Sequence, residues 1–200
     1  MKWIAYLLIA AGILTMSYPK LKAAYTTHQE KELVSEWEAA KKSYSSLDTV
    51  FASESAAAAS EKPADPPPKN GSLLGKISIP RIEVELPVVE GASQKNLKNA
   101  AGHLEGTAPL GGAGNAALAA HRSYTYGKQF NRLNEMKKHD EIMVETADGE
   151  FTYKVFSITI VEPDDTSVLK QKEGENILTL ITCEPMKNPT HRLIVQAKKQ

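Results

Sequence analysis

Hydrophobic and polar residues follow different patterns in successive parts of this chain, and each pattern predicts a different structure. Residues 1–22 are mostly apolar, residues 23–47 place apolar side chains at helical spacing, and residues 48–72 are rich in Ala, Ser and Pro. From residue 73 onward, short apolar runs alternate with Gly, Pro, Asn and Asp, which is typical of β-strands joined by turns. The chain is therefore predicted to contain a membrane anchor, an amphipathic helix, a flexible linker and one folded domain at residues 73–200.

The amino-terminal segment has no charged residue between Lys2 and Lys20, an interval of about 17 residues. This is at the lower end of the length that can span a bilayer as a helix. A cleaved signal peptide is the alternative, but no small-x-small cleavage site follows the apolar run. An uncleaved anchor at residues 1–22 is the favoured prediction. Because lysines flank the run on both sides, charge counting does not decide on which side the rest of the chain lies.

The next segment, residues 23–47, has the pattern of one amphipathic helix, with charged side chains away from an apolar stripe. Such a stripe either pairs with a second copy of the chain, as in a short coiled coil, or packs on the folded domain. The sequence leaves both possibilities open. Residues 48–72 lose the periodicity and predict an extended tether. The stripe consists of Leu33, Trp37, Ala40, Tyr44 and Leu47.

The folded domain is predicted to be all-β. Seven strands in about 125 residues favour a closed or nearly closed antiparallel barrel. Short helical turns are expected at residues 94–101 and 129–136. The predicted strands are residues 75–79, 84–89, 115–120, 141–146, 150–161, 177–182 and 192–197.

The only cysteine, Cys183, follows an apolar run at the end of a predicted strand. A turn rich in Pro and Asn leads to the next strand, so a hairpin-like reversal would make Cys183 and Arg192 neighbours at one edge of the sheet. His121 also ends an apolar run, residues 116–120. Together these residue types can supply a thiolate nucleophile, a proton donor to a leaving amine and a donor to an oxyanion.

Composition limits the alternatives. Lys and Arg total 24 and Asp and Glu total 24, so no net charge indicates nucleic-acid binding. One cysteine cannot form an internal disulfide, and the scattered histidines offer no zinc-ligand spacing. The competing interpretation is a membrane-tethered binding or scaffold domain with an inert, buried cysteine, because a lone cysteine after an apolar run is often a small buried hydrophobe.

Several motifs resemble those of sortases, the cysteine transpeptidases of Gram-positive cell surfaces. TLITC at residues 179–183 matches the TLxTC signature of that family. AAHR, ending at Arg122, resembles the segment with the catalytic histidine, and HRLIV at residues 191–195 resembles the strand with the catalytic arginine. The resemblance extends over residues 74–199. It implies an eight-stranded barrel, so the count of seven strands is expected to miss one.

The resemblance also implies a mechanism. Cys183 is expected to attack the Thr carbonyl of an LPxTG-like sorting signal and to form a thioacyl enzyme. His121 is expected to protonate the leaving amine and to deprotonate the incoming one, and Arg192 to hold the substrate and stabilise the oxyanion. The acceptor would be an amino group of a peptidoglycan precursor. The catalytic domain would lie on the extracellular face of a Gram-positive cell membrane, attached by a single span.

Two departures from related sequences bear on the class of sortase. Ala119 and Ala120 stand where many relatives have Gly before the histidine segment. The pilin-polymerising class carries a lid with an Asp-Pro-aromatic motif, whereas Asp65 and Pro66 are followed here by Pro67. With one amino-terminal anchor and no carboxy-terminal membrane segment, the chain resembles class D sortases of bacilli and clostridia most, with class A as the alternative.

Three more residues are candidates for substrate binding. Thr182, beside Cys183, is either a substrate contact or a buried strand hydroxyl, and His103 lies in a Gly-bounded loop as a fallback base. Val161 begins the loop, residues 161–175, whose shape is expected to decide which sorting peptide is preferred. No cofactor is required. Four acidic residues near this loop fit a solvated loop better than a Ca²⁺ site: Glu162, Asp164, Asp165 and Glu173.

Overall fold

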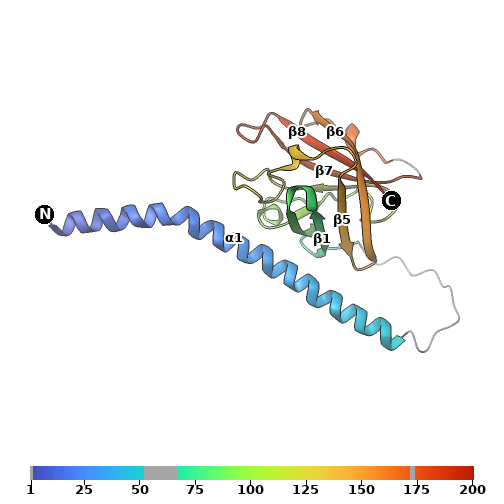
Figure 1. Ribbon diagram of the computed structural model, residues 1–200, viewed down its shortest axis with the longest axis horizontal. Coiled ribbons are helices and arrows are strands. Elements are labelled where there is room, and N and C mark those ends of the chain that lie inside the picture. The colour runs from blue at the N-terminus through green and yellow to red at the C-terminus, as the bar shows by residue number, and fades with distance from the viewer. Residues whose placement is uncertain (1, 52–66, 172–173) are drawn as a thin grey trace.

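The computed structural model describes residues 2–51, 67–171 and 174–200, and it consists of one long helix beside a β-barrel (Figure 1). The helix, α1, is continuous from Lys2 to Phe51. The predicted anchor and the predicted amphipathic helix are thus parts of one element, without a break near residue 22. Among the described residues, no helical stretch is long and apolar enough to cross a membrane. Residues 52–66 of the predicted linker lie outside the described residues.

Eight strands form a closed barrel in the order β1-β2-β3-β4-β7-β8-β6-β5, and pairing of β1 with β5 completes it. The prediction of a closed all-β barrel is confirmed. The strands are β1 (Leu73–Ile79), β2 (Val84–Glu90), β3 (Ala101–His103), β4 (Gly114–Ala119), β5 (Glu141–Thr146), β6 (Gly149–Val161), β7 (Asn176–Glu184) and β8 (His191–Lys199).

The barrel differs from the prediction in two respects. The strand that the sequence pattern missed is β3, which begins inside the predicted helical turn at residues 94–101; only Asn96–Lys98 forms a 3-10 helix there. In the other predicted turn, only Leu133–Glu135 is helical. The prediction that all pairings are antiparallel is wrong, because β2 pairs with β3 and β4 pairs with β7 in parallel.

A glycine explains why β3 was hard to recognise. A Cβ atom on Gly102 would lie 2.7 Å from the carbonyl oxygen of Gly91 and 2.8 Å from the Cα atom of Ala92. Only glycine therefore lets β3 lie against the turn that follows β2. A strand of three residues with a glycine at its centre has no alternation of polar and apolar side chains, so no pattern announces it.

The barrel interior is filled with apolar side chains from all eight strands. The largest is Tyr153 of β6, which is 1% exposed and whose hydroxyl accepts a hydrogen bond from the amide of Gly111 at 3.0 Å. Burial raises the pKa of Tyr153. Phe130 and Leu133, in the connection from β4 to β5, are also fully buried in this core. They fix the chain that follows His121.

The middle of α1 packs on the barrel. Trp37 is 4% exposed, a value that an isolated helix cannot give to an indole, and α1 contacts β1 and β2. The Glu38 carboxylate lies 2.8 Å from Lys76 Nζ on β1, and the Glu30 carboxylate lies 2.6 Å from Lys128 Nζ in the β4–β5 connection. Among the described residues, one buried aromatic side chain, two ion pairs and a hydrogen bond from Asn99 to Gln29 therefore join the helix to the barrel.

These contacts show what the apolar stripe of α1 does. Trp37 is buried, and Leu33 and Ala40 are half-buried, so this part of the stripe packs on the folded domain of the same chain. The side chains of Tyr44 and Leu47 lie outside the described residues. By contrast, Trp3 near the start of the helix is 84% exposed.

Substitution of the buried indole is expected to release the helix. Trp37→Ala should remove about 3 kcal/mol of docking free energy, the usual cost of truncating a buried Trp. Hydrogen exchange of full-length protein should then show faster exchange of amides in residues 24–40 and unchanged protection in β7 and β8. Trp3→Ala is the matched control and should exchange like the wild type. Equal protection of α1 in the wild type and the Trp37 variant would contradict this role of Trp37.

Candidate active site

The antiparallel pair β7 and β8 places Cys183 directly opposite Arg192. The two residues are Cα partners in the register, which runs without a break from Ile177↔Lys198 to Glu184↔His191. Figure 1 shows the two strands side by side in the upper part of the barrel. The hairpin-like reversal and the adjacency of the two residues are therefore as the sequence predicted.

On its other side, β7 is joined to the segment that carries His121. The parallel pairing continues past the end of β4, because the Ala120 amide donates to the carbonyl oxygen of Ile181 at 3.2 Å. The Thr182 hydroxyl donates to the carbonyl oxygen of Ala120 at 2.9 Å. The next residues along the two segments are His121 and Cys183. The structure thus brings all three sequence-predicted catalytic candidates to one end of the barrel.

All three candidates lie on the outer face of the barrel. Ala120, Leu180 and Leu193 belong to the interior core. Because successive side chains along a strand point to opposite faces, His121, Cys183 and Arg192 point outward.

These outward side chains are also accessible. Each of the three residues is half-buried rather than buried. The alternative interpretation, which needs an inert cysteine buried in the core, does not fit a half-buried Cys183 on the outer face.

The polar groups of the three candidates are largely free of protein partners. Within the described residues, the Arg192 guanidinium forms no ion pair, and its Nη1 donates to the neighbouring carbonyl oxygen of His191 at 3.0 Å. The His121 ring likewise makes no side-chain hydrogen bond in the part of the chain that the structure describes. Apart from that one bond of Arg192, the guanidinium and the imidazole remain available to a bound molecule.

A hollow of about 460 Å³ lies along β6 and β8 near these residues. Val161, one of the predicted substrate-binding residues, lines it and is the Cα partner of Arg192. The hollow is also bordered by the 3-10 helix η4 (Thr166–Leu169), in the loop that was predicted to select the peptide. Its lining consists of Ser157, Thr159, Ile160, Val161, Ser167, Val168, Lys170 and Gln196.

Two acidic residues of this loop have local partners. The Asp165 carboxylate accepts a hydrogen bond from the Ser167 amide at 2.9 Å and caps η4, and hydrogen bonds from Ser167 lower the pKa of Asp165. Glu162 lies 3.1 Å from His191 Nε2. Glu173 is outside the described residues. Within those residues, no cluster of three or more His, Cys, Asp or Glu is arranged to hold a metal ion.

Thr182 faces the interior rather than the outer face that carries Cys183. It is 2% exposed, and its hydroxyl is bonded to the Ala120 carbonyl. Of its two predicted roles, the structure matches the buried strand hydroxyl. Through this bond, Thr182 ties the residue before His121 to the residue before Cys183.

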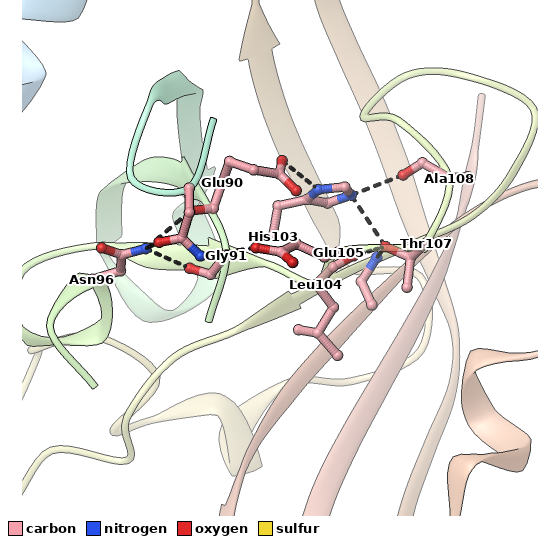
Figure 2. Close-up of polar contacts among 10 residues, drawn as sticks. Glu90, Gly91, Asn96, His103, Leu104, Glu105, Thr107 and Ala108 are labelled. Atoms are coloured by element: carbon pink, nitrogen blue, oxygen red, sulfur yellow. Dashed lines mark hydrogen bonds and ion pairs between the residues drawn. The ribbon is translucent and has the colours of Figure 1, made fainter. Parts of the chain in front are cut away.

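His103 also lies inside the barrel, apart from the outer face that carries Cys183. Its Nδ1 lies 2.9 Å from Glu90 Oε2, and its Nε2 lies 2.9 Å from the Ala108 carbonyl oxygen and 3.1 Å from Thr107 Oγ1 (Figure 2). The side chains of His103 and Glu90 are 7% and 8% exposed. Its Cα partner is the inward-facing Leu118. The site does not include His103, which instead satisfies polar groups within the barrel.

The buried pair of Glu90 and His103 is expected to contribute to stability and not to the site. Glu90→Gln should lower the free energy of unfolding by about 1–3 kcal/mol, because a neutral amide forms a weaker hydrogen bond to His103 inside the barrel than a carboxylate does. Urea denaturation of the full-length chain measures this change. Glu150→Gln, the same substitution at an exposed strand position, is the control and should change stability by less than about 0.5 kcal/mol. Similar losses in both variants would show that the buried pair has no special part in stability.

Comparison with known proteins identifies the family. The family model for the sortase domain matches residues 77–200. The chain is 30% identical over 202 residues to sortase D of Bacillus subtilis (strain 168), an alignment that covers 99% of this chain and 98% of that protein. It is 34% identical over 123 residues to sortase A of Bacillus anthracis, covering 62% of this chain and 58% of that one.

Solved structures agree with the sequence comparison. A sortase D5 transpeptidase of Clostridium perfringens superposes with a TM-score of 0.68 at 29% identity, covering 86% of this chain and 98% of that chain. Sortase C1 of Streptococcus agalactiae superposes with a TM-score of 0.62 at 34% identity, covering 65% and 70% of the two chains. The chain therefore belongs to the sortase family of cysteine transpeptidases.

Two charged residues beside the site were not singled out from the sequence. Arg122 follows His121 and Glu184 follows Cys183, and their side chains form an ion pair. Arg122 Nη1 also lies 3.4 Å from the carbonyl oxygen of Cys183. The available signal was a pair of opposite charges directly after two candidate residues at strand ends. That signal becomes informative only when the parallel pairing of β4 with β7 is known.

Proposed function

We propose that this chain is a sortase that cleaves an LPxTG-like sorting signal after Thr and transfers the protein to an amine of a peptidoglycan precursor. The observation that carries the proposal is the register of the strands, in which Cys183 lies between Arg192 on β8 and the His121 segment on the outer face. The alignment with sortase D over 99% of the chain supports assignment to class D.

In the proposed reaction, the Cys183 thiolate attacks the carbonyl carbon of Thr and forms a tetrahedral oxyanion. The peptide C–N bond then breaks, His121 gives a proton to the leaving amine, and the acyl group remains on Cys183 as a thioester. The acceptor amine attacks this thioester and loses a proton to His121, and the Cys183 thiolate leaves. The guanidinium of Arg192 supplies hydrogen-bond donors to the oxyanion of each step.

The hollow beside Arg192 is the proposed site for the part of the sorting signal that precedes Thr. Ile160, Val161 and Val168 give it an apolar wall, which suits the Leu and Pro of an LPxTG-like peptide. Because Val161 pairs with Arg192 and Arg192 pairs with Cys183, a peptide in this hollow could reach the thiol. Because η4 forms part of this wall, the conformation of the loop at residues 161–175 would influence which peptide binds.

The proposed location follows from the family and from the amino-terminal sequence. Sortases are in general cell-surface enzymes of Gram-positive bacteria. We place the first 22 residues of this chain in the cell membrane, on the basis of their uncharged run of about 17 residues. The barrel would then lie on the extracellular face.

The reaction can be tested by mass spectrometry of the full-length chain incubated with an LPxTG-like peptide and diaminopimelate as the amine. Cleavage after Thr and an acyl adduct on Cys183 are expected for the wild type. Cys183→Ala should abolish both and keep the thermal unfolding midpoint. Undiminished turnover in the Cys183→Ala variant would rule out the proposed nucleophile.

The role of the guanidinium can be tested separately. Arg192→Lys keeps the charge but loses the planar fork of donors, so kcat/KM for the peptide should fall on the order of 100-fold. Arg81→Lys, the same substitution at a position on the η1 turn (Pro80–Ile82), is the matched control and should retain wild-type kcat/KM. Wild-type rates for the Arg192 variant would remove this residue from the mechanism.

A further inference from the structure

We propose that Arg122 and Glu184 are positioning residues that hold His121 and Cys183 in the alignment that acyl transfer requires. The inference rests on the proposed function, because this alignment matters when His121 and Cys183 act on one substrate. Each charged residue directly follows one of the two candidates, on neighbouring segments of the barrel. The pair therefore joins the two segments one residue beyond the reacting groups.

The geometry places this pair behind the reacting face. Arg122 and Glu184 follow outward-pointing residues, so strand alternation directs them toward the open end of the barrel interior. The Arg122 side chain is 7% exposed and the Glu184 side chain 23% exposed. Neither side chain shares the outer face with Cys183. They line a second hollow of about 460 Å³, which adjoins the first at Thr159 and Ile160 and is also lined by Asn134, Ile158 and Leu193.

The pair lies where backbone pairing between the two segments has ended. Two hydrogen bonds are the last contacts of the β4–β7 ladder. The Ala120 amide donates to the carbonyl oxygen of Ile181, and the Thr182 hydroxyl donates to the carbonyl oxygen of Ala120. In the described part of the chain, no backbone hydrogen bond joins His121 to β7; its carbonyl oxygen accepts from Phe130 instead. The next link between the segments is the Arg122 guanidinium.

This link is bifurcated. Arg122 Nη1 is paired with the Glu184 carboxylate and lies 3.4 Å from the carbonyl oxygen of Cys183. One guanidinium thus contacts both the backbone of the candidate nucleophile and the side chain that follows it. Nη1 carries two N–H donors in the plane of the guanidinium, so this one nitrogen can serve both acceptors.

Stability alone is a poor explanation for such a pair. Burial of the Arg122 cation carries a desolvation cost, and its Nε has no hydrogen-bond partner among the described residues. Apolar residues of similar volume are often at least as stabilising as a buried ion pair. Alignment gives a stronger reason, because a displacement of about 1 Å between reacting groups can lower a rate about 100-fold.

The test is a double-mutant cycle in the full-length chain, with Arg122→Met, Glu184→Gln and the double variant. Each single variant should lower kcat for peptide cleavage by about 10- to 100-fold, with KM changed less than about twofold, because neither side chain lines the hollow proposed for the peptide. The double variant should be no slower than the slower single variant, because the two residues act through one contact. Arg122→Lys, which keeps the charge, should recover part of kcat.

The control is Glu135→Gln, which removes the carboxylate 2.9 Å from Arg132 in the same β4–β5 connection. It should leave kcat unchanged. Thermal unfolding of every variant separates misfolding from misalignment. If a single variant fails to fold, the double variant still tests the pair, because it leaves no unpaired charge behind. Wild-type kcat in folded variants, or additive losses in the double variant, would overturn the inference.

The alkylation rate of Cys183 with iodoacetamide separates this inference from the proposed function. We expect the rate in Arg122→Met to differ at least about threefold from the rates in the wild type and in Glu135→Gln. If the wild type cleaves no peptide and this difference is present, the proposed function fails and the positioning of Cys183 stands. If the wild type cleaves peptide but the cycle and the alkylation rates show no effect, the positioning inference fails and the proposed function stands.

Discussion

The parallel pairing of β4 with β7 is the constraint on which the site depends. Six residue pairs align the two strands, and the carboxyl ends of both reach the same edge of the sheet. Parallel neighbours cannot be joined by a tight turn, so the chain between them must leave and return. Here that excursion contains β5 and β6, which close the barrel on β1 and β8. The closure of the barrel and the approach of His121 to Cys183 are thus consequences of one backbone register.

The sequence predicted those features that depend on local pattern. Seven strands have runs of apolar residues bounded by turn formers, and the contact of Cys183 with Arg192 follows from a reversal within about ten residues. The position of His121 was inferable as a strand end, but its neighbour was not, because parallel register is decided by contacts about 60 residues apart. Likewise β3 has three residues and no alternation, and its pairing with β2 depends on the absence of a side chain at Gly102.

Charged residues were the least predictable part of the structure. Glu90 and His103 meet inside the barrel, and Arg122 meets Glu184 at its end, although charged side chains in a sequence normally indicate solvent. Each pair joins strands whose pairing the sequence does not reveal, so neither partner could be recognised alone. The structure distinguishes the two histidines that the sequence offered as bases. His103 lies in the interior, and His121 faces outward beside the thiol.

The contact of α1 with the β4–β5 connection limits how far the barrel can lie from the membrane. Glu30 on the helix meets Lys128, seven residues after His121 in the chain. An α-helix rises about 1.5 Å per residue, so a helix that leaves the bilayer at residue 22 would advance only about 12 Å before it reaches this contact. With the anchor proposed above, the outer face of the barrel would lie close to the lipid surface. Acceptors and sorting signals would then have to be presented beside the membrane rather than out in the wall.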